Sequence, residues 1–300
     1  MSRHRRPGAE DRDHPAGQDI LEPFGSRAVR TAVVGHVEWI TFARVDHVPV
    51  PGEIIHADEV FELPAGGGPV AAVQLFKLAG DCTFFTALGD DELGHRAKDE
   101  IEAMGMRVEA VFRPERQRTG FTHVDATGER TITVMGERLG PRADDPLPWH
   151  ELDDADAVFF TAGDDDALRR ARRAETLVAT LREAERLQRV GVYLDAVVGS
   201  GNDPAERYEP IEPEPGAVVL TFGGEGGTFT TSEVRDGRFE AVPLAGPRVC
   251  AYGAGDSFMG GLTYALGAGM PITDALELAS RCGAASLTGR GPYEGQLTRP

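Results

Sequence analysis

Lysine is scarce in this chain: only Lys77 and Lys98 occur among 300 residues, and the other basic side chains are arginines. Mechanisms that need a lysine, such as Schiff-base formation or a lysine-held phosphate, therefore have few candidates. The motifs G-x-x-x-x-G-K-[ST], G-x-S-x-G and H-E-x-x-H are missing, and no G-x-G-x-x-G follows the first expected strand. A P-loop is excluded, and a dinucleotide-binding fold, a serine hydrolase or a zinc protease lacks its fingerprint.

Cysteines and long apolar runs are also few. Cys82, Cys250 and Cys282 form no C-x-x-C pair, and so small an odd number does not support a disulfide framework. No apolar stretch approaches the ~20 residues that a membrane-spanning helix needs, and the N-terminus lacks the apolar core of a signal peptide. These absences predict a soluble, cytoplasmic protein with free thiols.

Acidic residues outnumber basic ones. Asp and Glu number 49 against 31 Lys and Arg, which gives a formal net charge of −18. This balance opposes binding to nucleic acid or to an anionic membrane. We therefore expect a small-molecule substrate, and neither a nucleic-acid nor a membrane partner.

The chain divides into a tail and one large domain. Residues 1–28 carry many charges, Pro and Gly with little apolar periodicity, which predicts a flexible N-terminal tail. Over residues 29–300, apolar runs typical of buried strands alternate with helical segments. The strands are expected at Val29–Gly35, Cys82–Leu88, Ala157–Phe160, Val190–Leu194 and Ala217–Thr221.

Helical periodicity is clearest in two segments. Over Asp165–Arg189, apolar residues recur every three or four positions with Arg and Glu opposite, which predicts one amphipathic crossover helix. Glu92–Met104 shows the same spacing and stops before Gly105, a residue type favoured at helix ends. Strands alternating with helices predict an α/β fold, with a doubly wound, mostly parallel, Rossmann-like sheet.

Two regions depart from that alternation. Residues 44–63 and 119–135 alternate apolar and polar side chains around the turns Pro51-Gly52 and Thr127-Gly128, as half-buried strands do. The inserted segments, over about 44–63 and 107–135, are expected to pair as a small β-sheet lid. The lid would cover the edge of the main sheet where ligands of open α/β folds bind.

The most informative motif is Gly253-Ala254-Gly255-Asp256, directly before an expected helix that ends near Gly267. Glycines ahead of a helix let backbone N–H groups approach an anion, and the helix dipole adds positive potential. An anion hole beside a carboxylate suits phosphoryl transfer, in which the amides hold the phosphoryl group and Asp256 takes the proton of an attacking hydroxyl. Alternatively, Asp256 only stabilises the first helical turn.

Two weaker motifs lie upstream of it. Thr221, Gly223 and Gly226 follow an expected strand and could lie against a nucleotide, or they form a glycine-rich hairpin turn. Asp203 and Glu206 are three residues apart and could hold Mg²⁺, or they form a capping box.

A third glycine cluster lies near the N-terminus. Gly66, Gly67 and Gly68 precede an expected helix over Val70–Leu78. They could lie against a sugar hydroxyl or a phosphate, or they form an ordinary loop before a helix.

The order of these motifs resembles that of the ribokinase-like (PfkB) carbohydrate kinase family from about residue 29 to the C-terminus, and G-A-G-D with its helix is the specific element. The resemblance implies a Rossmann-like domain with a β-sheet lid that transfers the γ-phosphoryl group of ATP to a primary hydroxyl of a sugar or nucleoside. It implies Asp256 as catalytic base, with Gly253, Ala254 and Gly255 as anion hole. Family lids often pair between subunits, which implies a possible homodimer.

The resemblance also implies the surroundings of the nucleotide. Thr221, Gly223 and Gly226 would line it, and Asp203 with Glu206 would organise Mg²⁺ and the phosphates. The acid at 203 replaces a usual Asn, which adds negative charge beside the metal.

Other positions depart from the family pattern. Cys250 and Ala251 replace the usual Asp-Thr of a monovalent-cation site, so potassium is a doubtful cofactor. Ala71 stands where the family has an Asn that touches the sugar. Glu38 follows the first strand in place of the usual Asn and Asp and could bind substrate hydroxyls, while Trp39 could stack on a ring or pack in the core.

The sequence therefore predicts an ATP- and Mg²⁺-dependent kinase acting on a sugar or a sugar-like molecule. A nucleoside (adenosine-type) kinase is the first alternative. A catalytically weak ligand-binding protein on the same fold is another, because the usual Asn, Asp and Asp-Thr are missing. A nucleotide-dependent oxidoreductase rests on fold analogy alone.

Overall fold

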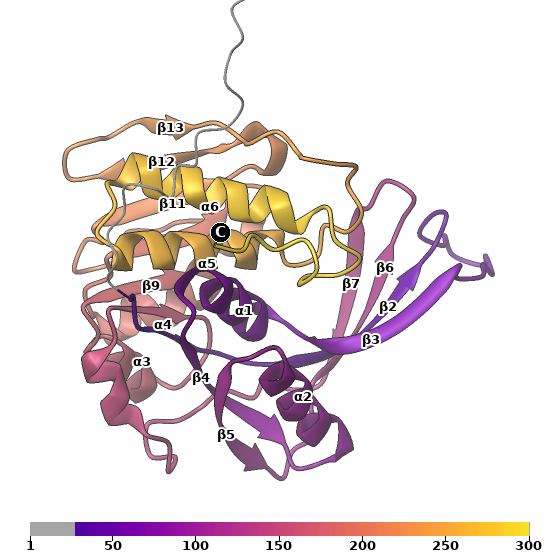
Figure 1. Ribbon diagram of the computed structural model, residues 1–300, viewed down its shortest axis with the longest axis horizontal. Helices are drawn as coiled ribbons and strands as arrows, with labels where there is room; N and C mark the ends of the chain where they lie inside the picture. The colour runs from indigo at the N-terminus through magenta and orange to yellow at the C-terminus, as the bar shows by residue number, and fades with distance from the viewer. Residues whose placement is uncertain (1–27, 300) are drawn as a thin grey trace, which may run out of the picture.

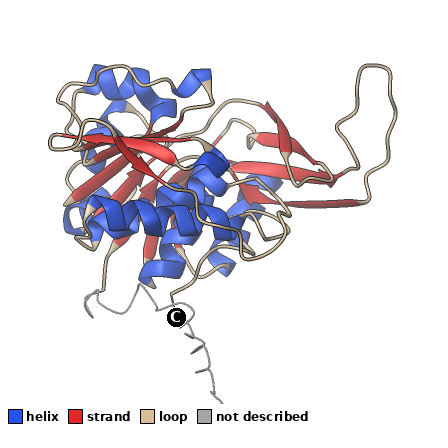
Figure 2. Ribbon diagram, turned by 90° about the horizontal axis from the view of Figure 1, so that it is seen from above, coloured by secondary structure: helices blue, strands red, loops and turns tan. Residues whose placement is uncertain are grey.

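The computed structural model describes residues 28–299, so the expected tail lies, except for its last residue, outside the described part. The chain forms a nine-stranded sheet and a separate four-stranded sheet. Helices cover both faces of the larger sheet, and the smaller sheet extends from one side of it (Figures 1 and 2).

The larger sheet has the strand order β13-β12-β11-β10-β9-β8-β1-β4-β5. Neighbours from β11 to β5 are parallel, and β12 and β13 add an antiparallel edge. From β1 the chain passes to β4 and β5 on one side and then to β8 on the other, so the topological switch point lies between β1 and β8. The bounds are β1 (Thr31–Val34), β4 (Cys82–Gly89), β5 (Arg107–Arg113), β8 (Ala157–Phe160), β9 (Thr176–Thr180), β10 (Ala196–Ser200), β11 (Ala217–Thr221), β12 (Gly227–Thr231) and β13 (Gly237–Phe239).

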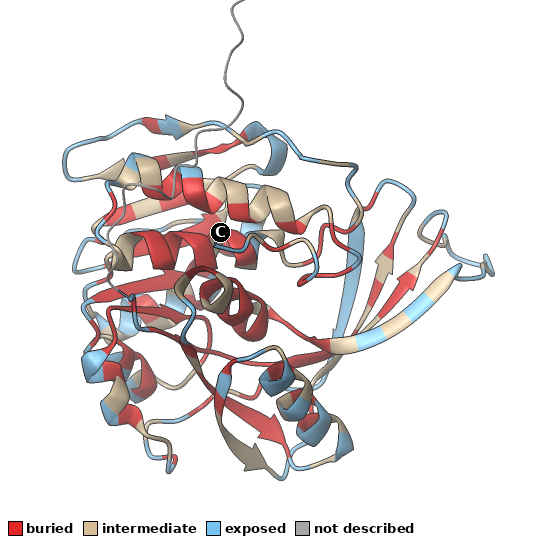
Figure 3. Cartoon of the chain, viewed as in Figure 1, coloured by how far each residue is buried: buried red, intermediate tan, exposed pale blue. Residues whose placement is uncertain are grey.

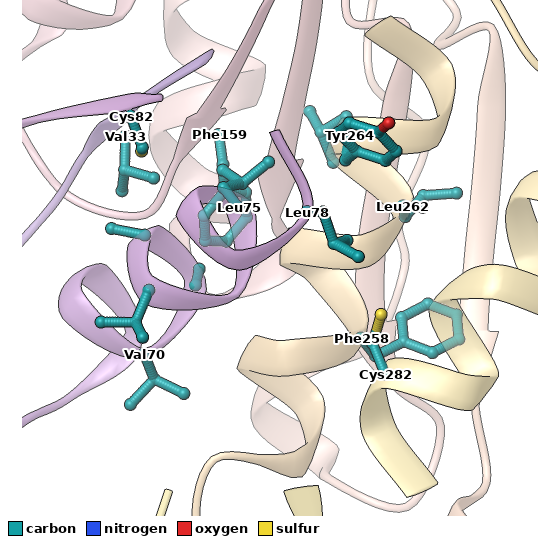
Figure 4. Packing of buried hydrophobic residues seen from close by; sticks show 14 of the residues in the cluster. Val33, Val70, Leu75, Leu78, Cys82, Phe159, Phe258, Leu262, Tyr264 and Cys282 are labelled. Carbon is teal, nitrogen blue, oxygen red and sulfur yellow. The ribbon is translucent and has the colours of Figure 1, made fainter. Parts of the chain in front are cut away.

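Helices pack on both faces because successive side chains of the buried strands point in opposite directions and are apolar on each side. One face carries α1 (Gly67–Ala79), α5 (Ala254–Gly267) and α6 (Ile272–Ser286). Helices α1 and α5 pack on the sheet around Val33 and Phe159, and α6 packs on α5, where Cys282 lies beside Phe258 (Figure 4). The other face carries α3 (Asp165–Ala171) and α4 (Ala184–Val190), packed on the neighbouring strand residues Val34 and Phe160.

Helix α2 (Glu92–Ala103) covers β4 and β5 and ends close to where the sequence predicts, before Gly105 with φ 100. The predicted doubly wound, mostly parallel sheet is therefore confirmed. Among residues 28–299, no helix combines the length and the apolar character that crossing a membrane requires.

The smaller sheet is the expected second β-sheet, with the order β3-β2-β6-β7. Its strands are β2 (Glu38–Arg44), β3 (Glu59–Ala65), β6 (Thr119–Val124) and β7 (Arg130–Met135). In the first inserted segment the strands lie at the two ends and residues 45–58 connect them. The prediction that the lid starts at residue 107 is wrong, because β5 pairs with β4 in the larger sheet. An edge strand covered on one face shows the same alternation as a lid strand.

The predicted single helix over residues 165–189 is also wrong. This stretch contains α3, the buried strand β9, the 3₁₀ turn η2 (Leu181–Glu183) and all of α4 except its last residue, Val190. A short apolar run is compatible with the repeat of a helix and with that of a buried strand. Here it forms a strand, because β9 is buried between β8 and β10. The strand expected at 190–194 lies instead at β10, because α4 extends to Val190 and ends at Gly191 with φ 64.

Candidate active site

The candidate site lies at the carboxyl ends of β1 and β8, at the switch point of the larger sheet. The Thr161 N–H donates to the Val34 carbonyl at 2.9 Å and ties these strand ends together. A Cβ atom at Gly67, in the first turn of α1, would lie 3.0 Å from Thr161 Oγ1 and 3.1 Å from Asp256 Oδ1. Three segments that are far apart in the sequence therefore meet around Asp256.

The Gly253–Asp256 motif forms the turn into α5. Gly253 has φ 81, and a Cβ atom there would lie 2.9 Å from both Val70 and Pro292, so glycine is required. No side chain among residues 28–299 caps this helix, and Gly255 is exposed. The first-turn N–H groups are therefore free of side-chain acceptors at the positive end of the helix dipole, as an anion hole requires.

Asp256 forms no hydrogen bond or ion pair with any residue that the structure describes. Its residue surface is partly exposed, whereas its carboxyl group is deeply set. Burial is the main cause that raises the pKa of Asp256 to about 6; Arg182 and Arg130 oppose this shift, and Glu206 and Glu38 add to it. A carboxyl group that exchanges its proton near neutral pH is suited to act as a base.

His36 and Glu38 form a buried polar group beside the start of α1, and each is at most 7% exposed. Glu38 Oε1 lies 2.8 Å from Arg118 Nε and 3.7 Å from His36 Nε2. Burial raises the pKa of Glu38, although Arg118 opposes it. Burial, helped by Arg138, Arg118 and Arg182, holds the pKa of His36 well below its usual value, so the imidazole is neutral.

The Nδ1 atom of that imidazole is buried and has no hydrogen-bond partner among residues 28–299. Buried polar atoms in proteins are nearly always hydrogen-bonded, so an orphaned one needs an explanation. A ligand with hydroxyl groups would supply the missing partner.

The glycines before α1 divide into packing and site positions. Gly66 has φ 90, and its N–H donates to Tyr252 Oη at 3.1 Å. A Cβ atom at Gly68 would lie 2.5 Å from the carbonyl oxygen of His36, which shows close backbone packing. Gly67 is the one that lies against Asp256, so it is the strongest substrate-binding candidate of the three.

Asp203 and Glu206 lie just after β10, around the 3₁₀ turn η3 (Pro204–Glu206). Asp203 Oδ1 accepts from Ala205 N at 2.9 Å, so Asp203 caps this turn, while Glu206 Oε2 accepts from Ser200 N at 2.8 Å. Arg182 Nη2 reaches the other oxygen of each, at 2.8 Å from Asp203 Oδ2 and 2.7 Å from Glu206 Oε1. Within residues 28–299 no cluster of three or more His, Cys, Asp or Glu suits a metal ion.

Thr221, Gly223 and Gly226 form the end of β11 and its turn into β12, so the hairpin interpretation describes their conformation. Gly223 and Gly226 have φ 60 and 79, and Phe222 N donates to the Gly226 carbonyl at 2.8 Å. Gly201 N donates to the Thr221 carbonyl at 2.9 Å, which holds this turn beside the end of β10. A Cβ atom at Gly223 would meet nothing within 4 Å, so the backbone is open to a ligand there.

The residues that depart from the family pattern lie mostly in the core. Trp39 is 2% exposed and carries the Arg96 guanidinium over its ring at 4.5 Å, so it packs and is closed to a sugar ring. Ala71 is fully buried in α1. Burial raises the pKa of the Cys250 thiol, which therefore stays neutral and offers no charged ligand to a cation.

Sequence reasoning missed Thr161 and three arginines, Arg118, Arg138 and Arg182. Arg182 falls within the single helix predicted over residues 165–189, whereas in the structure it follows β9 at the ligand edge of the sheet. The available signal was the apolar run 177–179, which ends three residues before it, since a residue soon after a parallel strand lies at that edge.

The model of the pfkB family carbohydrate kinases matches residues 30–208 and 194–299. The chain is 26% identical over 296 residues to a fructokinase of Salmonella typhimurium, covering 80% of this chain and 92% of the relative. It is 26% identical over 282 residues to an ATP-dependent ribose-1-phosphate kinase of Halopiger xanaduensis, covering 85% and 91%. A ribokinase of Arabidopsis thaliana, solved with ribose and ATP, superposes with a TM-score of 0.70 at 16% identity over 91% and 96% of the two chains.

The chain therefore belongs to the pfkB family of carbohydrate kinases. Its fold is that of the ribokinases, and it is a sugar kinase. The family predicted from the order of the motifs is confirmed.

Proposed function

We propose that this kinase transfers the γ-phosphoryl group of ATP to a primary hydroxyl of a sugar or sugar-like molecule, with Asp256 as base and the N–H groups of Gly253, Ala254 and Gly255 as anion hole. The observation that carries the proposal is a carboxyl group with a pKa of about 6 and no ion-pair partner among the described residues, in the first turn of an uncapped helix at the switch point. Relatives named fructokinase and ribose-1-phosphate kinase, and a structural neighbour solved with ribose and ATP, support this donor and acceptor.

In the reaction, Asp256 accepts the proton of the acceptor hydroxyl as its oxygen bonds to the γ-phosphorus. The bond from the γ-phosphorus to the bridging oxygen breaks, and ADP leaves with that electron pair. The backbone N–H groups stabilise negative charge on the phosphoryl oxygens, and water receives the proton from Asp256 in the next step.

The acceptor lies between Gly67 and the start of the lid in this proposal. Glu38 accepts hydrogen bonds from sugar hydroxyls, and its ion pair with Arg118 fixes its side chain. His36 Nδ1 gains the partner that it lacks among the described residues. Thr221, Gly223 and Gly226 line the nucleotide on the other side of Asp256.

Mg²⁺ is expected to accompany ATP, and carboxylate oxygens are ligands it prefers. Asp203 and Glu206, however, have every oxygen engaged, by a backbone N–H or by Arg182. The residues present therefore do not fit an open, protein-held Mg²⁺ site. Any metal would arrive on the phosphates of ATP. The neutral Cys250 thiol likewise argues against a bound monovalent cation.

The test is ADP formation from ATP in a coupled assay with a panel of sugars, sugar phosphates and nucleosides. Turnover with a sugar supports the proposal, turnover with nucleosides alone supports the nucleoside-kinase alternative, and acceptor binding without turnover supports a ligand-binding protein. Tight NAD binding in a fluorescence titration would favour an oxidoreductase.

A homodimer through the lid stays a prediction. Every residue of the edge strand β7 is exposed, including Ile132, Val134 and Met135 (Figure 3). Light scattering of the wild type and of Val134→Lys would test it, with a shift from dimer to monomer expected. The three cysteines are buried free thiols, which fits the cytoplasmic location expected from the sequence.

A further inference from the structure

Arg182 is a charged residue at the ligand edge of the larger sheet, and no sequence motif assigns it a role. It lies in the turn after β9 and contacts both acids of the neighbouring turn, Asp203 and Glu206. The Arg182 side chain is 51% exposed and that of Glu206 is 10% exposed. The guanidinium therefore lies between a buried carboxylate and solvent.

Its orientation is fixed before any ligand binds. Each acid holds Arg182 with one oxygen and a backbone N–H with the other, from Ala205 or Ser200. A guanidinium has five N–H donors in a rigid fork, and both contacts are made by Nη2. Three donors remain for a ligand, and little side-chain entropy is left to lose when they bind one.

The charge of Arg182 acts on the reacting groups. It opposes the rise in the pKa of Asp256 more than any other charge, and it also lowers the pKa values of His36 and Glu38. Its field therefore covers both Asp256 and the acceptor end of the site.

Neither lysine is available for this task. Lys77 Nζ donates to the Tyr293 carbonyl, and Lys98 pairs with Glu102 on α2. A fixed protein cation for a phosphate chain must therefore be an arginine, and Arg182 is held ready beside the turn that would receive the nucleotide.

We propose that Arg182 is a phosphate-binding residue for the nucleotide, and that Asp203 and Glu206 are positioning residues that aim it and are not metal ligands. This inference rests on the proposed function, because the ligand is the phosphate chain of ATP or ADP.

Calorimetric titration of the full-length protein with ADP in the presence of EDTA tests the proposal without any metal. Arg182→Gln is expected to weaken ADP binding about 10- to 100-fold, because charge-assisted hydrogen bonds are lost. Arg182→Lys keeps the positive charge but lacks the forked donors of the guanidinium. Its affinity for ADP should lie between those of the wild type and of Arg182→Gln. Adenosine, which has no phosphate, should bind all three proteins equally, which shows that the fold of the site is intact.

Arg189→Gln is the matched control. Arg189 is 56% exposed and also pairs with an acid, Asp165, but it lies at the end of α4, and its removal should change ADP affinity less than twofold.

Glu206→Gln should weaken metal-free ADP binding several-fold, because Arg182 loses one of the two carboxylates that orient it. A metal ligand at 206 would instead leave metal-free binding unchanged and lose the Mn²⁺ electron paramagnetic resonance signal of the ADP complex.

Equal metal-free ADP affinity of wild type and Arg182→Gln would overturn the inference, as would the metal-ligand behaviour of Glu206→Gln. If the wild type binds ADP and Arg182→Gln does not, while no acceptor is phosphorylated, the inference stands and the proposed function fails. If the wild type binds no nucleotide with or without Mg²⁺, both fail.

Discussion

The acids at the ligand edge of the sheet are held in opposite ways. Asp256 has no ion-pair partner among residues 28–299 and has a raised pKa, whereas Asp203 and Glu206 share the guanidinium of Arg182 and accept backbone hydrogen bonds. The first arrangement keeps a carboxylate reactive at the expense of stability, and the second fixes geometry. The comparison indicates that the proposed base and the residues proposed to orient Arg182 are distinguished by their partners and not by residue type.

Removal of the unpaired carboxylate should have the largest effect. Asp256→Asn is expected to lower kcat about 10²- to 10⁴-fold, because a general base is lost while size and shape are kept. Nucleotide affinity should stay within twofold of the wild type. Steady-state kinetics with ADP titrations check both values, and near-normal turnover would refute the assignment of the base.

The second-largest effect on activity is expected when an added methyl group crowds the Asp256 carboxylate. Gly67→Ala places a methyl group 3.1 Å from Asp256 Oδ1 and 3.0 Å from Thr161 Oγ1, and should lower kcat/KM about 10²-fold by displacing reacting groups. Gly246→Ala is the control, because a Cβ atom there meets nothing within 4 Å. Equal activity of the two variants would show that the acceptor does not lie beside Gly67.

Removing the charge of the unpaired Asp256 and of the paired Glu206 should change the free energy of unfolding in opposite directions. The pKa of Asp256 is raised from 3.8 to about 6 in the folded state, so its ionised form destabilises the protein above pH 6 and the effect disappears below pH 4. At pH 7.5, Asp256→Asn should raise the free energy of unfolding by about 1–2 kcal/mol, which is less than the full shift because the residue is partly exposed. Glu206→Gln should lower it by about 1 kcal/mol, since the buried carboxylate loses its pairing with the half-exposed Arg182 guanidinium. Urea denaturation at pH 7.5 checks both signs, and a repeat below pH 4 checks that the effect of Asp256→Asn disappears. A loss of stability in Asp256→Asn at pH 7.5 would contradict the unpaired state.

The pH dependence of the rate should be the smallest effect. Because the base must be ionised, kcat/KM is expected to fall about tenfold per pH unit below pH 6. The groups that set this value are Arg182 and Arg130, which favour the ionised form, and Glu206 and Glu38, which oppose it. Arg182→Gln should therefore move the acidic limb to higher pH, and an unchanged limb would show that its charge does not reach Asp256.

Sequence reasoning succeeded where a residue's role depends on its immediate neighbours. The turn at Gly253 needs a left-handed glycine, and the turn before α1 needs Gly66 for the same reason, so both are visible as glycine motifs ahead of helices. It failed over residues 165–189, where α3, β9 and α4 replace one predicted helix, because burial between two neighbouring strands overrides a helical period. Because of that error, the sequence placed Arg182 within a helix, whereas it lies at the ligand edge of the sheet.

The order of glycine turns, strands and helices determined the fold class, the family and the position of Asp256, because these depend on local backbone geometry and on apolar periodicity. Only the tertiary structure decided that Trp39 is closed to substrate, that Arg118 pairs with Glu38, and that Arg182 joins Asp203 to Glu206. Pairing of charges across strands depends on which strand ends become neighbours, and the order of strands in a sheet is not written in the spacing of residues along the chain.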